Sequence, residues 1–244
     1  MQNKEITLKI ISDIRTRKYS FTTSEQVSLL LDMKDTEINS FKSCWDNLVI
    51  DHYMADGGTY RYRRYGQFNK LANSNTLTMV PHGAYIQPYH INKLNGGIER
   101  HFEPLTDIFL NSPILTKILN IMSNIYDAAE EGAQNWNIRL HPYRIVATDD
   151  ENGHPTPEGL HRDGVNYIAT MMINRCNVLG GDTRITDTNK NELYNVTLKD
   201  TFDLVIANDA DTMHEVSPIS KKNTDLPTSR DVLVIAFTKI NLGN

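Results

Sequence analysis

From Trp136 to Ile240 the chain is a succession of short runs rich in β-branched and aromatic residues, which restricts the folds open to it. The runs include IRLHPYRIVAT, VNYIATMMI and DVLVIAFT, and clusters of Asn, Asp, Gly and Pro separate them. Such runs predict strands, and no helical segment lies between them to provide the crossovers of a parallel sheet. We therefore predict an antiparallel jelly roll, the cupin-like double-stranded β-helix, for this part of the chain.

Helices are expected ahead of these strands, so the predicted fold class is mainly β with N-terminal helices. The apolar residues of ITLKIISDIRTR recur at helical spacing, and TTSE offers capping groups for a helix over EQVSLLLDM. Ser112 and Pro113 suit the cap and the first position of a further helix, ILTKILNIMSNIY. Aromatic and β-branched runs between residues 59 and 90 predict additional strands.

The 244 residues contain no repeat, low-complexity tract or flexible linker, so we predict a single domain. In it, a mixed helical and strand part, residues 1–135, precedes the jelly-roll core, residues 136–244. The net charge of −5 disfavours a nucleic-acid-binding surface, which is normally basic. No apolar run approaches the ~20 residues of a membrane-spanning helix, so no membrane association is expected.

The expected location is the cytoplasm. The N-terminal residues lack the continuous apolar segment of a secretion signal. The two cysteines, Cys44 and Cys176, form no CxxC motif, which is typical of a reducing compartment without a disulfide framework.

Two histidines and one carboxylate are the residues most indicative of chemistry. His161 and Asp163 lie two residues apart, and His214 follows 53 residues later. On a strand, alternate residues point to the same side, so the first two can bind one ion while Arg162 faces away. This donor set is the one that leaves open positions on a non-haem Fe(II), and it predicts an oxygenase. Each histidine alone is more often structural, and HRD also opens the protein-kinase catalytic loop, but Ile168 stands where that loop needs Asn.

Arg230 adds a second requirement to this site. It opens the run DVLVIAFT, 16 residues after His214. When 2-oxoglutarate chelates iron, its far carboxylate is buried and needs a partner, and a guanidinium can bind it through two charge-assisted hydrogen bonds. The alternative is a solvated arginine at the end of a strand. Beside the two histidines and the aspartate, a role for Arg230 in binding 2-oxoglutarate is the favoured interpretation.

The segments HRDG, LGGDTRITD, DADTMHEVSPI and RDVLVIAFT, in this order, resemble the 2-oxoglutarate/Fe(II)-dependent dioxygenases. DGGTYRYRRYGQF, NGGIERHFEPL and RLHPYRIVAT are similar to segments of the bacterial branch that hydroxylates free amino acids and includes L-isoleucine 4-hydroxylase. The resemblance extends over residues 45–240. It implies a catalytic iron centre whose ligands are His161, Asp163 and His214.

The resemblance also implies roles for residues around the co-substrate. Arg230 becomes the residue that anchors 2-oxoglutarate. Many relatives carry a hydroxyl two residues after this arginine, where this chain has Val232. A second hydrogen bond to the co-substrate must then come from elsewhere, and Tyr143 and Thr183 are the candidates.

The implied activity is hydroxylation of a free, aliphatic L-amino acid by a 2-oxoglutarate-dependent non-haem iron dioxygenase. Fe(II) is the metal, and 2-oxoglutarate and O2 are consumed with release of succinate and CO2. Related halogenases replace the ligand aspartate with a small residue, so the presence of Asp163 favours hydroxylation.

Arginines are the candidates for binding the carboxylate of the amino acid. Strand alternation places Arg61 and Arg63 on one face of TYRYRRYGQF and Arg64 on the other. Arg144 in LHPYRIVAT is another candidate, on the opposite face from His141. For each of them, a solvated or structurally paired arginine is the competing interpretation.

Two alternatives to this activity stay open. The first keeps the same cofactors but acts on a peptidyl or carrier-bound residue. The second is a non-catalytic, cupin-like metal-binding module, which would have no need for a buried cation such as Arg230 opposite the metal. The expected partner is a small molecule, and a homodimer is left open.

Overall fold

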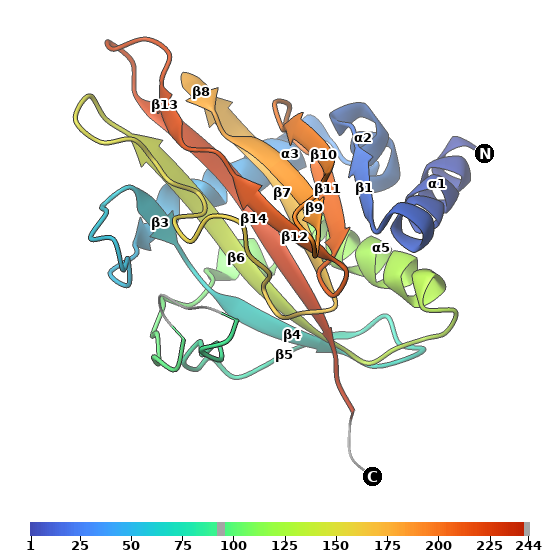
Figure 1. The fold of residues 1–244 in the computed structure, drawn as a ribbon. Helices are drawn as coiled ribbons and strands as arrows, with labels where there is room; N and C mark the ends of the chain where they lie inside the picture. The colour runs from blue at the N-terminus through green and yellow to red at the C-terminus, as the bar shows by residue number, and fades with distance from the viewer. Residues whose placement is uncertain (92–95, 242–244) are drawn as a thin grey trace.

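The structure, a computed structural model, describes residues 1–91 and 96–241, and antiparallel strands dominate it (Figure 1). A nine-stranded sheet has the order β1-β11-β7-β14-β6-β3-β2, with β4 paired to β6 and to β5. Its strands are β1 Tyr19–Thr22, β2 Val49–Ile50, β3 Arg61–Arg63, β4 Gly66–Lys70, β5 Leu77–Met79, β6 Trp136–Ala147, β7 Tyr167–Cys176, β11 Leu204–Asn208 and β14 Thr228–Lys239.

Two smaller sheets lie in front of the large one in Figure 1. One has the order β10-β9-β12 and the other pairs β13 with β8. Their strands are β8 Val178–Gly180, β9 Asp182–Asp187, β10 Glu192–Thr197, β12 Thr212–Val216 and β13 Ile219–Lys221. The chain alternates between the two layers from β7 to β14, which is the double-stranded β-helix, and the predicted fold class is confirmed.

The helices cover the far face of the large sheet. They are α1 Gln2–Arg17, α2 Ser24–Leu31, α3 Asp35–Ser43, the 3-10 helix η1 Cys44–Asn47, α4 Asp107–Leu110 and α5 Pro113–Ala129. As the spacing predicted, α1 buries Ile6, Ile10 and Ile14. The side chain of Thr23 caps α2 in a capping box, and Pro113 occupies the first turn of α5.

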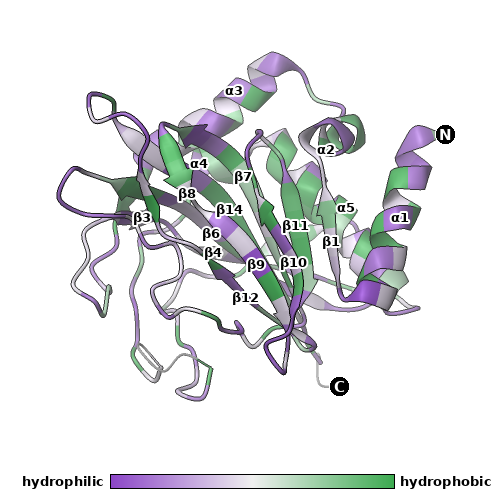
Figure 2. Cartoon of the chain, turned by 45° about the horizontal axis from the view of Figure 1, so that its top comes forward, coloured by the Kyte–Doolittle hydropathy of each residue, from purple (hydrophilic) through white to green (hydrophobic). Residues whose placement is uncertain are grey.

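Alternation along β14 divides the interior into two parts. Leu233, Ile235 and Phe237 point to the helices and belong to the main hydrophobic core. Val232 and Ala236 point the other way and pack with residues of the small sheets, such as Ile185 on β9. Figure 2 shows apolar residues gathered on the central strands and on the helices behind them. One strand therefore supplies the core on one face and a wall of the space between the layers on the other.

The N-terminal part contributes more to the sheet than the sequence indicated. Strands were expected between residues 59 and 90, where β3, β4 and β5 lie, but β1 and β2 lie before residue 59, where only helices were expected. β1 pairs with β11, so that Tyr19 lies opposite Ala207. A short strand whose partner lies far away in the chain has no periodic pattern in the local sequence by which it could be predicted. The division at residues 135 and 136 stays a prediction, although β6 begins at Trp136.

Within the described residues, none of the helices has both the length and the apolar character required to span a bilayer.

Leu233→Ala is predicted to lower the free energy of unfolding by about 2–5 kcal/mol, because it leaves a cavity in the core between β14 and the helices. Leu8→Ala is the matched control, since the Leu8 side chain is exposed on α1, and its effect should stay within about 0.5 kcal/mol. Urea unfolding with an unchanged m-value measures both. Equal effects of the two substitutions would contradict this assignment of the core.

Candidate active site

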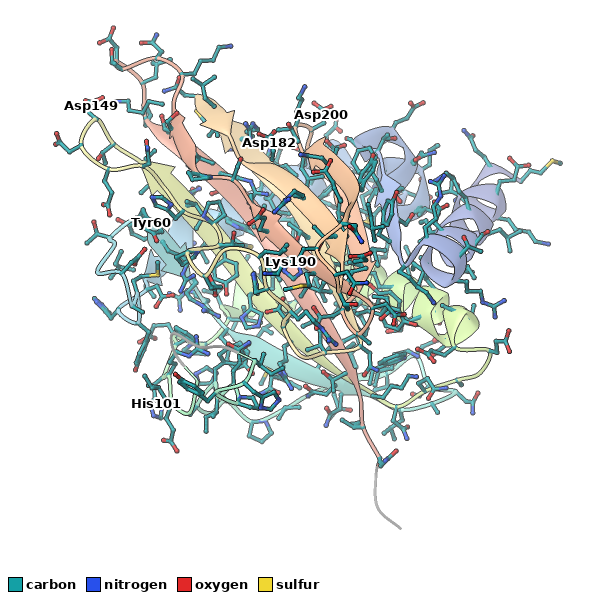
Figure 3. All side chains as sticks on the ribbon, viewed as in Figure 1. Tyr60, His101, Asp149, Asp182, Lys190 and Asp200 are labelled. Atoms are coloured by element: carbon teal, nitrogen blue, oxygen red, sulfur yellow. The ribbon has the colours of Figure 1, made fainter. Side chains whose placement is uncertain are left out.

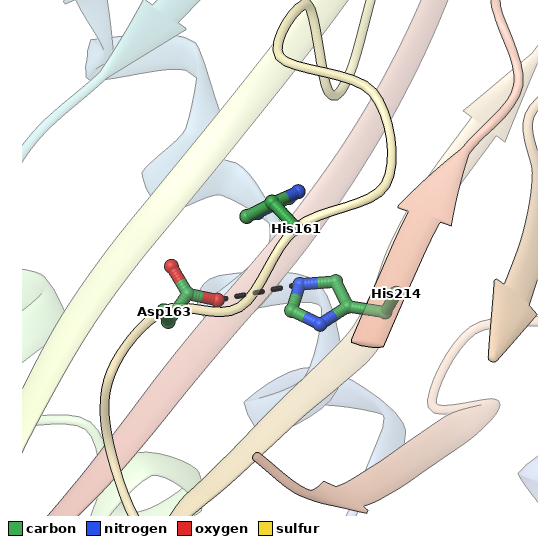
Figure 4. Close-up of side chains that lie close together, drawn as sticks. All are labelled: His161, Asp163 and His214. Atoms are coloured by element: carbon green, nitrogen blue, oxygen red, sulfur yellow. Dashed lines mark ion pairs between the residues drawn. The ribbon is translucent and has the colours of Figure 1, made fainter. Parts of the chain in front are cut away.

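His161, Asp163 and His214 meet in space as the sequence spacing predicted (Figure 4). Their potential ligand atoms all lie within 4.8 Å of one another. Nε2 of His214 is 3.3 Å from Oδ2 of Asp163, and the centroids of the two imidazole rings are 4.5 Å apart. Three donor atoms this close together, two nitrogens and one oxygen, can hold a divalent ion on one side and leave its other positions open.

The local backbone differs from the expected strand. His161 forms a single antiparallel bridge with His214, in which His161 N donates to His214 O at 3.1 Å and His214 N donates to His161 O at 2.9 Å. The residues after His161 then form a turn, and β7 begins only at Tyr167. The bridge, rather than strand alternation over several residues, brings the two imidazoles together.

The carboxylate of Asp209 holds this turn. Its Oδ1 accepts a hydrogen bond from the backbone N of Asp163 at 3.0 Å, and its Oδ2 accepts from Gly164 at 2.7 Å and from Val165 at 3.0 Å. Asp209 is fully buried. Burial and the charge of Asp163 raise the pKa of Asp209, while the N–H donors favour its charged form. Asp209 therefore fixes the direction of the Asp163 side chain without contributing a ligand atom of its own.

The surroundings of His161 and Asp163 also suit metal binding. Nδ1 of His161 lies 2.8 Å from Gly159 O, so the proton resides on Nδ1 and Nε2 keeps its lone pair. Burial works against the charged form of Asp163, but the hydrogen bond from His214 and the charges of nearby histidines hold its pKa well below the ordinary value. A deprotonated carboxylate and an available imidazole nitrogen are the forms in which these groups bind a cation. The residues present thus fit an Fe(II) centre.

A cavity of about 820 Å³ opens beside the three ligands. Alternate residues of β6 (His141, Tyr143, Ile145) and β14 (Arg230, Val232, Val234, Ala236) form its floor. Met213 and Val216 of β12 line it from the small sheet. Lys190, labelled in Figure 3, reaches it from the β9–β10 turn. This volume suits a small molecule and its co-substrate together.

Arg230 lies in this cavity as a buried cation. Its side chain is 1% exposed, and Nε and Nη2 have no hydrogen-bond partner among the described residues. Burial and the neighbouring Arg175, its cross-strand partner, lower the pKa of Arg230 to about 10. Gly181 packs against this side chain, where a Cβ would lie 3.2 Å from Cδ of Arg230, and its φ of +75° also favours glycine. A desolvated guanidinium with free donors is suited to an anionic ligand.

The two candidate helpers of Arg230 have different surroundings. Tyr143 lines the cavity. Thr183 is buried on β9, two residues after Gly181, and within the described part of the chain its Oγ1 has no partner. The sequence reasoning did not single out Arg175, whose Nη1 is likewise buried and unpaired there. Its position opposite Arg230 depends on the register of β7 and β14.

The predicted pair on β3 is buried on one face, as alternation required. Arg61 donates from Nε to Asp51 at 2.8 Å and lines the cavity. Arg63 lies 3.7 Å from the same carboxylate and 2.5 Å from Nδ1 of His141. Asp51 therefore neutralises part of the positive charge of Arg61 and Arg63, the two arginines that the sequence suggested for binding the substrate carboxylate. Arg64 turns away and donates to the carbonyls of residues 47 and 104.

Arg144 is a correction to the sequence interpretation. It lies on the face of β6 opposite His141 and Tyr143, where it binds both carboxylate oxygens of Asp231 at 2.8 Å and Asp46 at 3.2 Å. The cavity is lined by the other face of the strand. Asp231 follows Arg230, so the same alternation that directs Arg230 inward directs this ion pair outward. Arg144 is not placed to bind a ligand in the cavity.

Comparisons with known proteins agree with this geometry. A family model described as 2OG-Fe dioxygenase matches residues 42–236. The 3(1)-hydroxy-L-isoleucine 4-dioxygenase of Pantoea ananatis (strain AJ13355) is 28% identical over 224 residues, 91% of this chain and 88% of that protein. The L-isoleucine-4-hydroxylase of Bacillus thuringiensis is 25% identical over 201 residues, 78% and 80% of the two chains. The crystal structure of a BsmA homologue from Methylobium petroleophilum PM1 has a TM-score of 0.86 and 31% identity, covering 95% of this chain and 92% of that chain.

Asp209→Asn is predicted to weaken divalent-metal binding by about 10- to 100-fold, because an amide cannot accept all three backbone hydrogen bonds that position Asp163. Asp211→Asn is the control, since Asp211 lies in the same turn but forms an exposed ion pair with Lys18. Anaerobic calorimetric titration with Fe(II) measures both affinities. A folded Asp209→Asn protein with unchanged Fe(II) affinity would show that the turn holds its shape without this carboxylate.

Proposed function

The chain belongs to the 2OG-Fe dioxygenase family, whose enzymes use Fe(II), 2-oxoglutarate and O2, and we propose that it hydroxylates a free, aliphatic L-amino acid. The single observation that carries the proposal is that the three candidate iron ligands and the buried, unpartnered Arg230 share one cavity. The names of two relatives, both of which act on isoleucine or hydroxyisoleucine, support an aliphatic amino acid as the substrate.

The metal and co-substrate roles follow from the site. We propose that His161, Asp163 and His214 hold the iron. Iron, when bound, supplies the oxidising chemistry that couples decarboxylation of 2-oxoglutarate, to succinate and CO2, with transfer of one oxygen atom to a C–H bond. Arg230 would bind the far carboxylate of 2-oxoglutarate, since its free donors face the cavity. Tyr143 and Thr183 are proposed to add hydrogen bonds to the co-substrate.

The residues that line the cavity determine which C–H bond of the substrate lies next to the metal. Val165, Ile168, Met213 and Val216 give the cavity apolar surface near the ligands, which suits an aliphatic side chain and excludes water. Holding the target carbon in one orientation is the chain's main contribution, because the reactivity comes from the cofactors. The carboxylate of Asp163 occupies the position that a halide would need, so hydroxylation is the proposed outcome.

The buried Arg230 and the family of the chain also bear on the two alternative functions. A non-catalytic metal-binding module would not need the buried Arg230, and family membership supports an enzyme. A peptidyl or carrier-bound substrate keeps the same cofactors and becomes an outcome of the substrate test. A cytoplasmic location, supported by two cysteines without a disulfide, and a homodimer both stay proposals. Light scattering of the purified protein decides the oligomeric state.

With Fe(II), 2-oxoglutarate and O2, the protein is predicted to release succinate only when a suitable free amino acid is present. The product should carry one added oxygen by mass spectrometry. His161→Ala and His214→Ala should abolish this turnover and weaken Fe(II) binding, since each removes one of three ligands. No turnover with any free amino acid, together with activity on a peptidyl residue, would replace the proposed substrate class.

Arg230→Gln is predicted to raise the KM for 2-oxoglutarate by about 100-fold while leaving Fe(II) affinity near that of the unmodified protein, because it removes a buried charge partner of the co-substrate. Arg184→Gln is the control, since Arg184 forms a partly exposed ion pair with Glu215 on the small sheet. A normal KM for 2-oxoglutarate in Arg230→Gln would assign the anchor to another residue, with Arg175 the first to test.

A further inference from the structure

Four arginines line the cavity: Arg61, Arg100, Arg162 and Arg230. Three of them have a function in the arrangement described above. Arg61 is paired with Asp51, and Arg230 is assigned to 2-oxoglutarate. Arg162 is only partly buried, so that solvent reaches it, and it donates from Nε to Asp209 O at 2.6 Å. Arg100 is the remaining one, and neither its charge nor its position in the cavity is explained by the contacts of the described residues.

The Arg100 side chain is 3% exposed and is held in one orientation. Nη2 donates to Oε1 of Gln87 at 2.8 Å, and Cζ lies 4.7 Å from the centre of the Tyr85 ring. The backbone is fixed as well, because Tyr85 and Arg100 exchange two hydrogen bonds, at 2.9 and 3.1 Å. The amide of Gln87 and the ring of Tyr85 position the guanidinium but leave its full positive charge.

The charge of Arg100 has no acidic partner among the described residues. No carboxylate there lies within ion-pair distance of it, and Nε is buried without a hydrogen-bond partner. A desolvated cation without a counter-ion is costly, and the protein keeps one only where a ligand or a structural need offsets the cost. The arrangement therefore resembles that of Arg230, since each is a buried guanidinium in the same cavity with a buried Nε that has no partner among the described residues.

Arg100 lines the same cavity as the three candidate ligands. Its neighbour Tyr85 lies 5.1 Å, ring to ring, from His141 on the cavity floor. Arg230 approaches the cavity from β14.

We propose that Arg100, positioned by Gln87, binds the α-carboxylate of the substrate amino acid. The proposal rests on the proposed function and makes it more specific. The carboxylate takes the donors of Arg100, and the aliphatic side chain extends along the apolar wall toward the metal ligands. Arg61 and Arg63 then have a supporting role. They share Asp51, and the guanidinium of Arg63 packs 3.5 Å from the Phe102 ring and 2.5 Å from Nδ1 of His141.

The test compares an amino acid that the protein oxidises with its carboxamide, which has the same shape but no negative charge. The unmodified protein should prefer the acid. Arg100→Gln should lower kcat/KM for the acid by about 100-fold and change the value for the amide little, so that the preference is lost. The KM for 2-oxoglutarate and the affinity for Fe(II) should stay near their original values, which also shows that the variant is folded.

Gln87→Glu separates a binding role from a structural one. It places a carboxylate on Arg100, which would stabilise a purely structural arginine and leave substrate binding unchanged. If Arg100 binds the substrate, the new carboxylate competes with it, and the affinity for the acid should fall while that for the amide is retained. Anaerobic calorimetry of the protein with Fe(II) and 2-oxoglutarate measures both affinities without turnover. This variant keeps Arg100 and gives an answer even if Arg100→Gln fails to fold.

Arg64→Gln is the matched control. Arg64 donates to Pro104 O, so it contacts the chain segment that follows Arg100, but it does not line the cavity. The Arg64→Gln variant should prefer the acid over the amide to the same extent as the unmodified protein. If Arg100→Gln and Gln87→Glu both keep that preference, the inference is wrong and Arg61 takes its place. If the unmodified protein oxidises no free amino acid, the proposed function fails instead, and the two failures are distinguishable.

Discussion

Two backbone hydrogen bonds between His161 and His214 are the contact on which the site depends. They join the segment before β7 of the large sheet to β12 of a small sheet, and so connect the two layers at the point where the ligand atoms meet. Asp209, at the turn between β11 and β12, extends this connection by holding the backbone of residues 163–165. Because the ligand carboxylate is positioned through main-chain groups, the geometry of the site is a property of the fold around it rather than of three side chains alone.

Buried positive charge is the second organising feature. Arg230 and Arg100 are both desolvated, lack an acidic partner among the described residues, and lie in one cavity. Arg61 and Arg144 show the other solution, in which an aspartate neutralises a structural arginine. On the proposed function, the unpaired guanidiniums of Arg230 and Arg100 bind anionic groups of the co-substrate and the substrate, whereas the arginines neutralised by an aspartate support the fold.

Strand alternation lets one sheet serve both purposes. The odd-numbered residues of β14 from Leu233 to Phe237 pack on the helices, and the even-numbered ones line the cavity. On β6, His141 and Tyr143 face the cavity while Arg144 faces Asp231. The floor of the cavity is therefore tied to the main hydrophobic core, so the cavity side chains stand on a rigid support, which a reaction that selects one C–H bond requires.

The sequence by itself determined the strand-rich second half, the helical spacing of α1 and the three candidate ligands, because each rests on local periodicity or on donor chemistry. For Arg230 it only favoured a role beside these ligands over a solvated arginine at the end of a strand. It did not determine which arginines are neutralised. Arg144 forms an ion pair with Asp231, which lies 87 positions later in the chain. Arg61 pairs with Asp51, a residue outside any strand or helix. Arg100 and Gln87 both lie outside the regular strands and helices as well. Asp209 likewise reaches Asp163 from 46 residues away. Only the tertiary structure decides these pairings, because they depend on the register of long-range strands and on burial, and neither leaves a pattern in the local sequence.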